Sequence, residues 1–460
     1  MKSKNLSLFI FFIFTINFLL ILNVFPQVAK EWVRRYDGPG YVFDRAKAIA
    51  VDSSGNVYVT GESYGGYETE DDYATIKYNS AGVQQWVVRY NGPVNGYDFA
   101  NAIVVDTSGN VYITGESVGS GQMNYDYATI KYNSSGVQKW VARYNGPGNG
   151  IDGAYAIALD SSGNVYVTGG SVGSGTNWDY ATIKYNSAGV EQWVKRYNGP
   201  GNEHDSAKAI AIDTSGNVYV TGESDYDYET IKYNSSGVQQ WAARYNSPGN
   251  YWDSAVAIAL DSSGNVYVTG WSYGPGTDSD YATTKYNSAG IQQWVARYNG
   301  PGNYYDSAVA IAVDTSGNVY VTGYSYSGAG INDDYATIKY NSIGIQQWVT
   351  RYNCPVNLVD RANAIALDSS GNIYVTGYSD DGSGSYYYNY DYVTIKYNNS
   401  GVQQWLARYN GPSGSGGDKA NAIAIDKSGN VYVTGESNYD YATIKYSQGT
   451  SGIDSIWALY

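Results

Sequence analysis

The stretch from residue 46 to residue 78 reads AKAIAVDSSGNVYVTGESYGGYETEDDYATIKY, and most of it returns seven more times along the chain. The motif Asp-x-Ser-Gly-Asn-(Val/Ile)-Tyr recurs at intervals of 48 to 58 residues. Its aspartates are Asp52, Asp106, Asp160, Asp213, Asp261, Asp314, Asp368 and Asp426. Self-similarity at such a period indicates that each copy is one supersecondary unit, which buries its apolar face only against its neighbours.

Each copy contains four short segments of β-branched and aromatic residues, which in the first copy are 46–51, 56–61, 73–78 and 83–90. Gly, Ser, Asn and Asp separate these segments, as they do in β-hairpins. The Asp52–Gly55 and Asn79–Gly82 turns open with a side chain that bonds its own backbone and end on Gly, which accepts a positive φ. Four antiparallel strands in each of eight copies predict an all-β fold, a β-propeller of eight four-stranded blades over residues 30–460.

The longer repeat also resembles a known family. Ala-Ile-Ala-x-Asp-x-Ser-Gly-Asn-Val-Tyr-Val-Thr-Gly, followed by Asp-Tyr-Ala-Thr-Ile-Lys-Tyr-Asn, is similar to the bacterial SBBP β-propeller repeat. The resemblance covers the chain from residue 30 onward and implies an exported bacterial protein, but no particular reaction. The family name implies seven blades, so seven is the alternative blade number. The spacing of Gly82 and Trp86 is similar to the tryptophan-docking repeat of quinoprotein propellers, of which only the structural half is present, so no quinone cofactor follows.

Nine segments have the character of an outer strand, although eight blades need only eight. If Asn79 opposes Gly82, residues whose numbers sum to 161 face each other, and Asp72 then faces Arg89. The equivalent pairs are Asp126–Arg143, Asp179–Arg196, Asp227–Arg244, Asp280–Arg297, Asp334–Arg351 and Asp391–Arg408. In the last copy, the arginine that can pair with Asp440 is Arg35, near the N-terminus. We therefore expect residues 31–36 to supply the outer strand of the last blade and to close the ring, which removes open sheet edges.

Residues 1–29 differ from the rest of the chain. Two lysines precede a largely apolar run of about twenty residues, which predicts a secretory signal peptide, with an uncleaved N-terminal membrane anchor as the alternative. Either reading places the remainder outside the cytoplasm, in the extracellular space, at the cell surface or in the periplasm. No other contact with a membrane is expected.

The composition limits the chemistry. The net charge of −14 argues against nucleic acid, because few cations are present to displace counterions from phosphates. One cysteine, Cys354, and one histidine, His204, argue against disulfides and against zinc clusters. We expect a monomer without a cofactor. Cys354 replaces a glycine of the recurring Asn-Gly-Pro crossover, and His204 is interpreted as an exposed loop residue.

An aspartate precedes every innermost strand, and the eight are Asp44, Asp98, Asp152, Asp205, Asp253, Asp306, Asp360 and Asp418. Such a ring at the mouth of the channel would offer oxygen ligands to Ca²⁺. The interpretation that we favour is that each aspartate caps its own crossover by accepting backbone N–H bonds. A residue present in all copies suits an architectural role better than an asymmetric site.

The turns on one face of the ring are nearly invariant, whereas the second-to-third-strand loops and the crossovers on the other face vary. Binding residues concentrate on variable loops held by a rigid scaffold, so this loop face is the expected functional face. Its aromatic candidates are Trp252, Trp271, Tyr273, Tyr304 and Tyr305 in blades 5 and 6, Trp178 in blade 3, and Tyr386, Tyr387, Tyr388 and Tyr390 in the longest loop. The alternative is that these rings only pack the loops together.

These features predict an exported binding or interaction module whose loop face recognises a polysaccharide or another surface protein. One alternative is an extracellular glycan hydrolase or lyase that uses carboxylates at the channel mouth, and another is a passive structural surface protein. An enzyme should carry one blade whose acidic residues break the repeat, and none is expected here.

Overall fold

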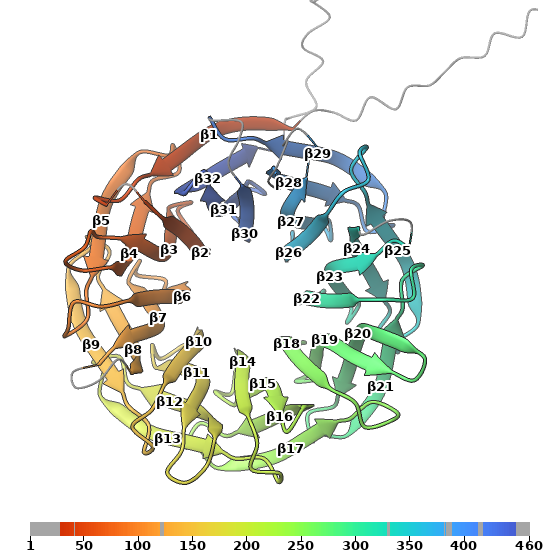
Figure 1. The fold of residues 1–460 in the computed structure, drawn as a ribbon, viewed down its shortest axis with the longest axis horizontal. Helices are drawn as coiled ribbons and strands as arrows, with labels where there is room; N and C mark the ends of the chain where they lie inside the picture. Colours follow the sequence, from red (N-terminus) through yellow and green to blue (C-terminus); the bar gives the residue numbers. More distant parts are fainter. Residues whose placement is uncertain are drawn as a thin grey trace, which may run out of the picture.

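The computed structural model describes residues 28–40, 42–119, 124–328, 332–380, 382, 389–412 and 417–447. Within these residues the elements are all strands, and they form eight antiparallel four-stranded sheets arranged as a closed ring around a central channel (Figure 1). The eight-bladed propeller expected from the repeats is therefore confirmed. The described residues contain no helix long and apolar enough to cross a membrane. The predicted signal peptide lies almost wholly in residues 1–27, outside the described residues.

Each blade begins at the channel and ends at the rim. The innermost strands are β2 (Asp44–Val51), β6 (Asp98–Val105), β10 (Asp152–Leu159), β14 (Asp205–Ile212), β18 (Asp253–Leu260), β22 (Asp306–Val313), β26 (Asp360–Leu367) and β30 (Asp418–Ile425). The second strands are β3 (Val57–Tyr64), β7 (Val111–Val118), β11 (Val165–Val172), β15 (Val218–Ser224), β19 (Val266–Gly274), β23 (Val319–Tyr326), β27 (Ile373–Asp380) and β31 (Val431–Ser437).

The third strands are β4 (Asp71–Tyr78), β8 (Tyr125–Tyr132), β12 (Trp178–Tyr185), β16 (Asp227–Tyr233), β20 (Thr277–Tyr286), β24 (Asp333–Tyr340), β28 (Tyr390–Tyr397) and β32 (Asp440–Ser447). The outer strands are β5 (Gln84–Tyr90), β9 (Gln138–Tyr144), β13 (Glu191–Tyr197), β17 (Gln239–Tyr245), β21 (Gln292–Tyr298), β25 (Gln346–Tyr352), β29 (Gln403–Tyr409) and β1 (Ala29–Tyr36). Blade 1 is β2–β5, blades 2 to 7 follow in chain order, and blade 8 is β30–β32 with β1.

The turn between the first two strands is held by the side chain that opens it. Asp52 Oδ1 accepts hydrogen bonds from the backbone N–H groups of Ser54 and Asn56, each at 2.9 Å, and Gly55 takes a φ of 76°. Asp52 Oδ2 accepts two more bonds, from the Asn56 amide at 2.7 Å and from the Tyr58 hydroxyl at 3.0 Å. The invariant residues of this turn therefore stabilise the turn itself, as predicted.

The register between the third and outer strands differs from the prediction. Arg89 lies opposite Ala74 rather than opposite Asp72 for two reasons. At the turn the Asn79 backbone N–H bonds to Val83 rather than facing Gly82, and a β-bulge between Lys77 and Tyr78 shifts the pairing of β4 with β5 by one further residue. The ion pair forms nevertheless, along the diagonal, with Arg89 Nη2 at 2.8 Å from Asp72 Oδ2. All eight predicted Asp–Arg pairs are present, at distances from 2.7 to 3.3 Å.

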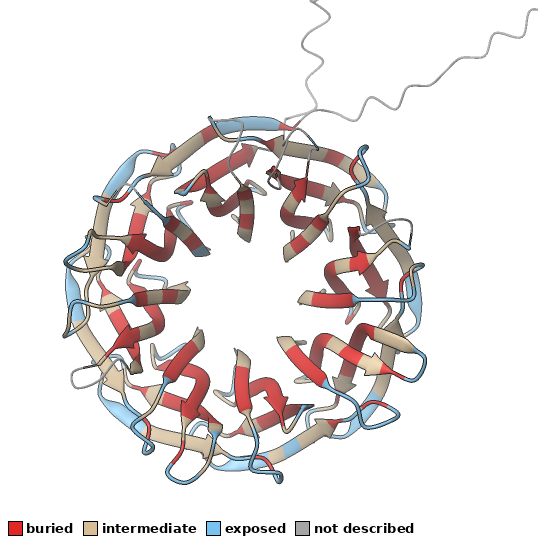
Figure 2. Cartoon of the chain, in the orientation of Figure 1, coloured by how far each residue is buried: buried red, intermediate tan, exposed pale blue. Residues whose placement is uncertain are grey.

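Neighbouring blades are joined by a buried tyrosine. Tyr73 of blade 1 is 2 % exposed, and its hydroxyl donates a hydrogen bond to the backbone carbonyl of Ala128 in blade 2 at 3.2 Å. The same bond is repeated at every interface of the ring, at 3.1 to 3.2 Å. One apolar cluster surrounds each interface, built from Val and Ile of one blade and Tyr of the other. Figure 2 accordingly shows the buried residues concentrated in the middle strands.

A tryptophan joins the rims of the blades on the turn face. The Trp86 indole N–H donates to the carbonyl of Ser134 in the next blade at 3.1 Å. Its ring packs on Gly136, where an added Cβ would lie 3.0 Å from the indole and where φ is +80°. Glycine is required there by the backbone and by the tryptophan together. The recurring Gly…Trp spacing in the sequence therefore reflects a contact between neighbouring blades.

The N-terminal strand closes the ring. β1 pairs with β32 in antiparallel fashion, so residues far apart in sequence complete one sheet (Figure 1). Arg35 Nη2 lies 2.7 Å from Asp440 Oδ2, and the Trp32 indole N–H donates to Ser80 of blade 1 at 3.3 Å. The predicted closure by residues 31–36 is confirmed. The competing C-terminal segment around Trp457 lies outside the described residues.

Deleting residues 30–37 should abolish cooperative folding, because it removes the outer strand of blade 8 together with its contacts to blade 1. Calorimetry would compare a chain that starts at residue 28 with the same chain lacking residues 30–37. The longer chain should unfold in one sharp transition and the shorter one should not. Equal melting of the two would contradict closure by β1.

Candidate functional site

Three positions meet at the loop face where blades 3 and 4, 5 and 6, 6 and 7, and 7 and 8 adjoin. They are the residue after the conserved Thr-Gly of the second strand, the residue before the third-strand Asp, and the residue after the crossover Asp of the next blade. Between blades 6 and 7 these are Tyr324, Asp333 and Arg361. The Arg361 guanidinium lies 4.4 Å from the centre of the Tyr324 ring and 2.6 Å from Asp333 Oδ2. Charged and aromatic groups therefore occupy these three positions and contact one another at this interface.

The interface between blades 5 and 6 is built differently. Here the three positions are Trp271, Ser279 and Ser307, and two small side chains replace the ion pair of the next interface. A cavity of about 200 Å³ is present at this place, which we call the first hollow. Its lining is aromatic and polar: Trp271, Tyr273, Ser279, Tyr305, Ser307 and Tyr324, with Asp333 and Arg361.

A second hollow adjoins the first between blades 6 and 7. Its volume is about 650 Å³, and it shares Tyr305, Asp333 and Arg361 with the first hollow. Its other lining residues include Tyr304, Tyr326, Asn332, Leu358 and Asp380. The two hollows thus form one concave region across blades 5 to 7 on the loop face.

The structure brings together five of the six predicted aromatic site residues. Trp271 lies between Trp252 and Tyr273, with ring centres 5.7 and 5.9 Å away, and Tyr304 and Tyr305 are 4.2 Å apart. The Trp252, Tyr304 and Tyr305 side chains are 44 to 48 % exposed. These rings contact one another and also face solvent, so packing and ligand contact are compatible.

Trp178 does not join this cluster. It stacks on His204 across the interface of blades 3 and 4, with ring centres 5.3 Å apart and an interplanar angle of 18°. Of the aromatic residues predicted in the longest loop, Tyr386, Tyr387 and Tyr388 lie outside the described residues, and Tyr390 lines the second hollow. The sequence placed all of these rings on one face and grouped them by blade, with Trp178 apart in blade 3, but it did not predict which rings contact one another.

The electrostatics of the two hollows are nearly balanced. Burial lowers the pKa of Arg361, but Asp333, Tyr378 and Tyr324 together outweigh that effect and raise the pKa, so the guanidinium stays charged and paired. Arg361 is the one basic residue in the two linings, which also contain Asp333 and Asp380. A hydrogen bond with Tyr304 raises the pKa of Tyr305 to about 12, so the Tyr305 phenol is neutral at ordinary pH.

Sequence reasoning missed Tyr324, Ser279, Ser307 and the Asp333–Arg361 pair. A signal was present, since the residue after Thr-Gly is Glu in blades 1, 2, 4 and 8, Gly in blade 3 and aromatic only in blades 5 to 7. Such a run of three neighbouring blades breaks the repeat on one side of the ring. The two serines carry no signal by themselves, because their effect depends on facing each other across an interface.

The eight crossover aspartates hold their own crossovers. Each is 0 to 1 % exposed, and one carboxylate oxygen accepts a backbone N–H bond of 2.5 to 2.7 Å from a residue six or seven positions earlier. These bonds are the capping contacts that we favoured. Among the described residues no three of the eight carboxylates come within 4.8 Å of one another. Asp44 instead approaches Asp37 and Asp440 at the seam of the ring.

One blade does contain an acidic residue that breaks the repeat, contrary to our expectation. Glu229 of blade 4 occupies a position that is Ala in six blades and Val in another. It is 2 % exposed, and its carboxylate lies 3.2 Å from Arg244 Nε. Arg244 also pairs with Asp225 and Asp227, so Glu229 belongs to a buried ion-pair network rather than to an accessible pair of acids.

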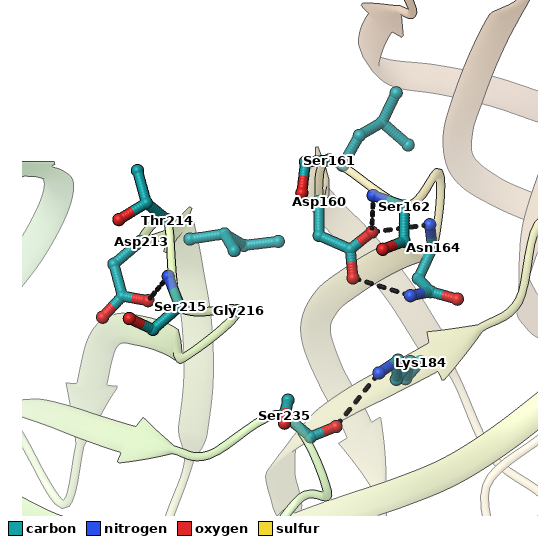
Figure 3. Close-up of a pocket in the computed structure, with 12 residues that line it drawn as sticks. Asp160, Ser161, Ser162, Asn164, Lys184, Asp213, Thr214, Ser215, Gly216 and Ser235 are labelled. Carbon is teal, nitrogen blue, oxygen red and sulfur yellow. Dashed lines mark hydrogen bonds between the residues drawn. The ribbon is translucent and has the colours of Figure 1, made fainter.

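A separate cavity of about 550 Å³ lies on the turn face between blades 3 and 4 (Figure 3). Asp160 in its lining accepts bonds from Ser162 and Asn164, and Lys184 donates to the Ser235 carbonyl at 3.0 Å. A cavity of about 530 Å³ with equivalent lining lies between blades 4 and 5. An equivalent cavity recurs at the next interface, and the polar groups of both linings bond within the protein. We therefore interpret this cavity as a consequence of the repeated blade structure.

Cys354 has a structural environment. The residue is 2 % exposed, its backbone N–H donates to Asp360 at 2.7 Å, and its Sγ accepts a bond from the Leu358 N–H. Burial raises the pKa of the thiol. Cys354 therefore occupies the crossover position that glycine occupies in most other copies, and its role there is structural.

Comparison with known proteins agrees with this architecture. The fold defines the class, an eight-bladed β-propeller. A family model described as the SBBP β-propeller repeat matches residues 31–68, 85–121, 192–229, 240–276, 293–328, 347–383 and 404–442, which is more than half of the chain. The chain belongs to this family. Residues 122–191 are not matched, although their described part contains β8 and β9 of blade 2 and β10 to β12 of blade 3.

No curated protein matches the chain. Among solved structures, Sqt1 from Chaetomium thermophilum is similar over 92 % of this chain and 100 % of its own, with a TM-score of 0.58 and 10 % identity. The Dos1 propeller is similar over 91 % of this chain and 95 % of its own, with a TM-score of 0.56 and 8 % identity. At such identities the likeness shows the fold alone.

The cap and turn aspartates should give the protein an acidic stability maximum. Burial raises the pKa of the cap residues, to about 6 for Asp98, Asp306 and Asp360. Burial also opposes ionisation of the turn residue Asp52, but hydrogen bonds from Asn56 and Tyr58 outweigh it and lower the pKa. A raised pKa favours folding below the unfolded value, and a lowered one favours folding above it.

The melting temperature should therefore fall as the pH rises from about 4 to about 7, through the folded pKa of the caps, and should fall again below about pH 3.5, where the turn carboxylates gain protons. Calorimetry across this range would measure both limbs. The double variant Asp306→Asn/Asp360→Asn should show a shallower loss between pH 4 and 7. A melting temperature that rises throughout that interval would contradict the assignment.

Proposed function

We propose that the protein is an exported binding module whose loop face recognises a polysaccharide. The observation that carries this proposal is the first hollow, where two serines leave space beside Trp271 and Tyr305. Sugar rings present C–H groups that pack on aromatic faces and hydroxyls that take hydrogen bonds. The lining supplies both kinds of partner, as binding sites with a few polar groups among apolar walls do.

The position of the hollow supports a specific ligand. The scaffold around it is uniform, whereas the aromatic residues after Thr-Gly occur only in three adjoining blades. Variable side chains held on a rigid frame are the usual form of a binding site. Export is the second part of the proposal, and it rests on the leader-like residues 1–29. N-terminal sequencing of the secreted protein would identify the cleavage site.

The binding test uses two tryptophans on the same face. The protein from residue 28 onward would be screened against a panel of polysaccharides, and the affinity of Trp271→Ala would then be compared with that of Trp178→Ala. Trp271→Ala should weaken binding at least tenfold, because it removes an aromatic wall of the first hollow. Trp178→Ala should bind like the parent, because Trp178 packs on His204 away from both hollows.

Melting temperatures of both variants serve as the control for folding. Release of reducing ends from a bound polysaccharide would indicate catalysis in addition to binding. The absence of binding to every polysaccharide on the panel would overturn the proposal and would favour a surface protein as the partner.

A further inference from the structure

The two hollows are suited to a ligand that extends from one to the other. They share Tyr305, Asp333 and Arg361, and they lie over consecutive blade interfaces. The first hollow, at about 200 Å³, is smaller than the ~300–1,000 Å³ of pockets that enclose a whole small molecule. The second, at about 650 Å³, falls within that range. A single ring-sized unit fits the first hollow, and a continuing chain has room in the second.

The charges in the linings select against an acidic ligand. Arg361 is held by Asp333 through two contacts, with Nε at 2.7 Å and Nη2 at 2.6 Å from Oδ2, and it stacks on Tyr324. Its charge is therefore already matched, and Asp380 adds a further carboxylate to the second hollow. A uronate or a sulfate would meet this carboxylate and a chain with a net charge of −14.

The remaining polar groups suit hydroxyls. Ser279, Ser307 and Tyr305 present hydroxyl groups that both donate and accept, and Asn332 adds an amide whose Nδ2 already donates to the Asn357 carbonyl. The paired Arg361 and Asp333 together present donors and acceptors without net charge. Uncharged sugars, which carry many hydroxyls of this dual character, match such a lining.

We infer that the ligand is an uncharged polysaccharide whose chain crosses blades 5 to 7, with one sugar unit in the first hollow and the following units in the second. This inference rests on the proposed function and specifies its ligand. The Arg361–Asp333 pair lines both hollows and so contacts the chain where it passes from one to the other.

The neighbouring interface supplies a variant that closes the first hollow. Ser279→Asp/Ser307→Arg introduces at blades 5 and 6 the ion pair that Asp333 and Arg361 form at blades 6 and 7. The fold already accommodates this pair at an equivalent place, so folding should be preserved. The matched control is Trp178→Asp/Ser206→Arg at blades 3 and 4, where both residues contact the equivalent position, Gly170.

Calorimetric titrations would use cello-, laminari-, xylo- and manno-oligosaccharides from disaccharide to hexasaccharide, with alginate and polygalacturonate as acidic probes. Affinity for one neutral series should rise with length until both hollows are occupied, and it should change little with salt. The hollow-closing variant should lose at least tenfold in affinity for the longest member and should retain its melting temperature. The control variant should bind like the parent.

Three results would overturn the inference while leaving polysaccharide binding intact. They are tighter and salt-sensitive binding of the acidic probes, equal affinity for the disaccharide and the hexasaccharide, and full affinity in the hollow-closing variant. Failure of the parent protein to bind any neutral or acidic probe would instead defeat the proposed function. A folding defect in the double variant would be recognised by its melting temperature, and Trp271→Ala would then replace it in the length series.

Discussion

The ring depends on one buried hydrogen bond made eight times. At each interface a tyrosine hydroxyl, excluded from water, donates to a backbone carbonyl of the next blade, and the last of these bonds runs from Tyr441 to Ala74. A buried hydroxyl without a partner would be costly, so each bond fixes the spacing and tilt of its two blades. The tryptophan contacts on the turn face repeat this constraint between blades, and the Asp–Arg pairs join the third and outer strands within each blade. Because these repeated contacts hold the ring together, the residues of the loop face can vary from blade to blade.

The ring of eight blades was predicted well from the sequence, because the residues that form it recur in every copy. Turn residues, strand number and the Asp–Arg pairs all follow from local patterns, and Arg35 was sufficient to identify β1 as the closing strand. The strands begin and end up to three residues away from the predicted limits, as Asp44–Val51 shows against 46–51. The register was missed because Asn79 pairs with Val83 rather than Gly82 at the turn, and because a bulge at Lys77 and Tyr78 is not visible in the composition.

The candidate site was predicted only in part, and the reason is geometric. Aromatic residues are visible in a sequence, so Trp271 and Tyr305 could be named, but Trp178 belongs to a different interface. The cavity arises from Ser279 and Ser307, which are unremarkable until the ring places them opposite each other. Arg361 and Asp333 were missed for the same reason, since their pairing spans two blades. Glu229 was overlooked among the alanines at its position, although the repeat itself displays the exception.

The central claim is that a uniform ring carries one asymmetric site, at the interface of blades 5 and 6. The most direct measurement is a crystal structure of the protein with the best-binding neutral oligosaccharide. The account predicts a sugar ring against Trp271 and Tyr305, with the chain continuing past Arg361 toward Tyr304. A sugar bound on the turn face, or over blades 1 to 4, would contradict it.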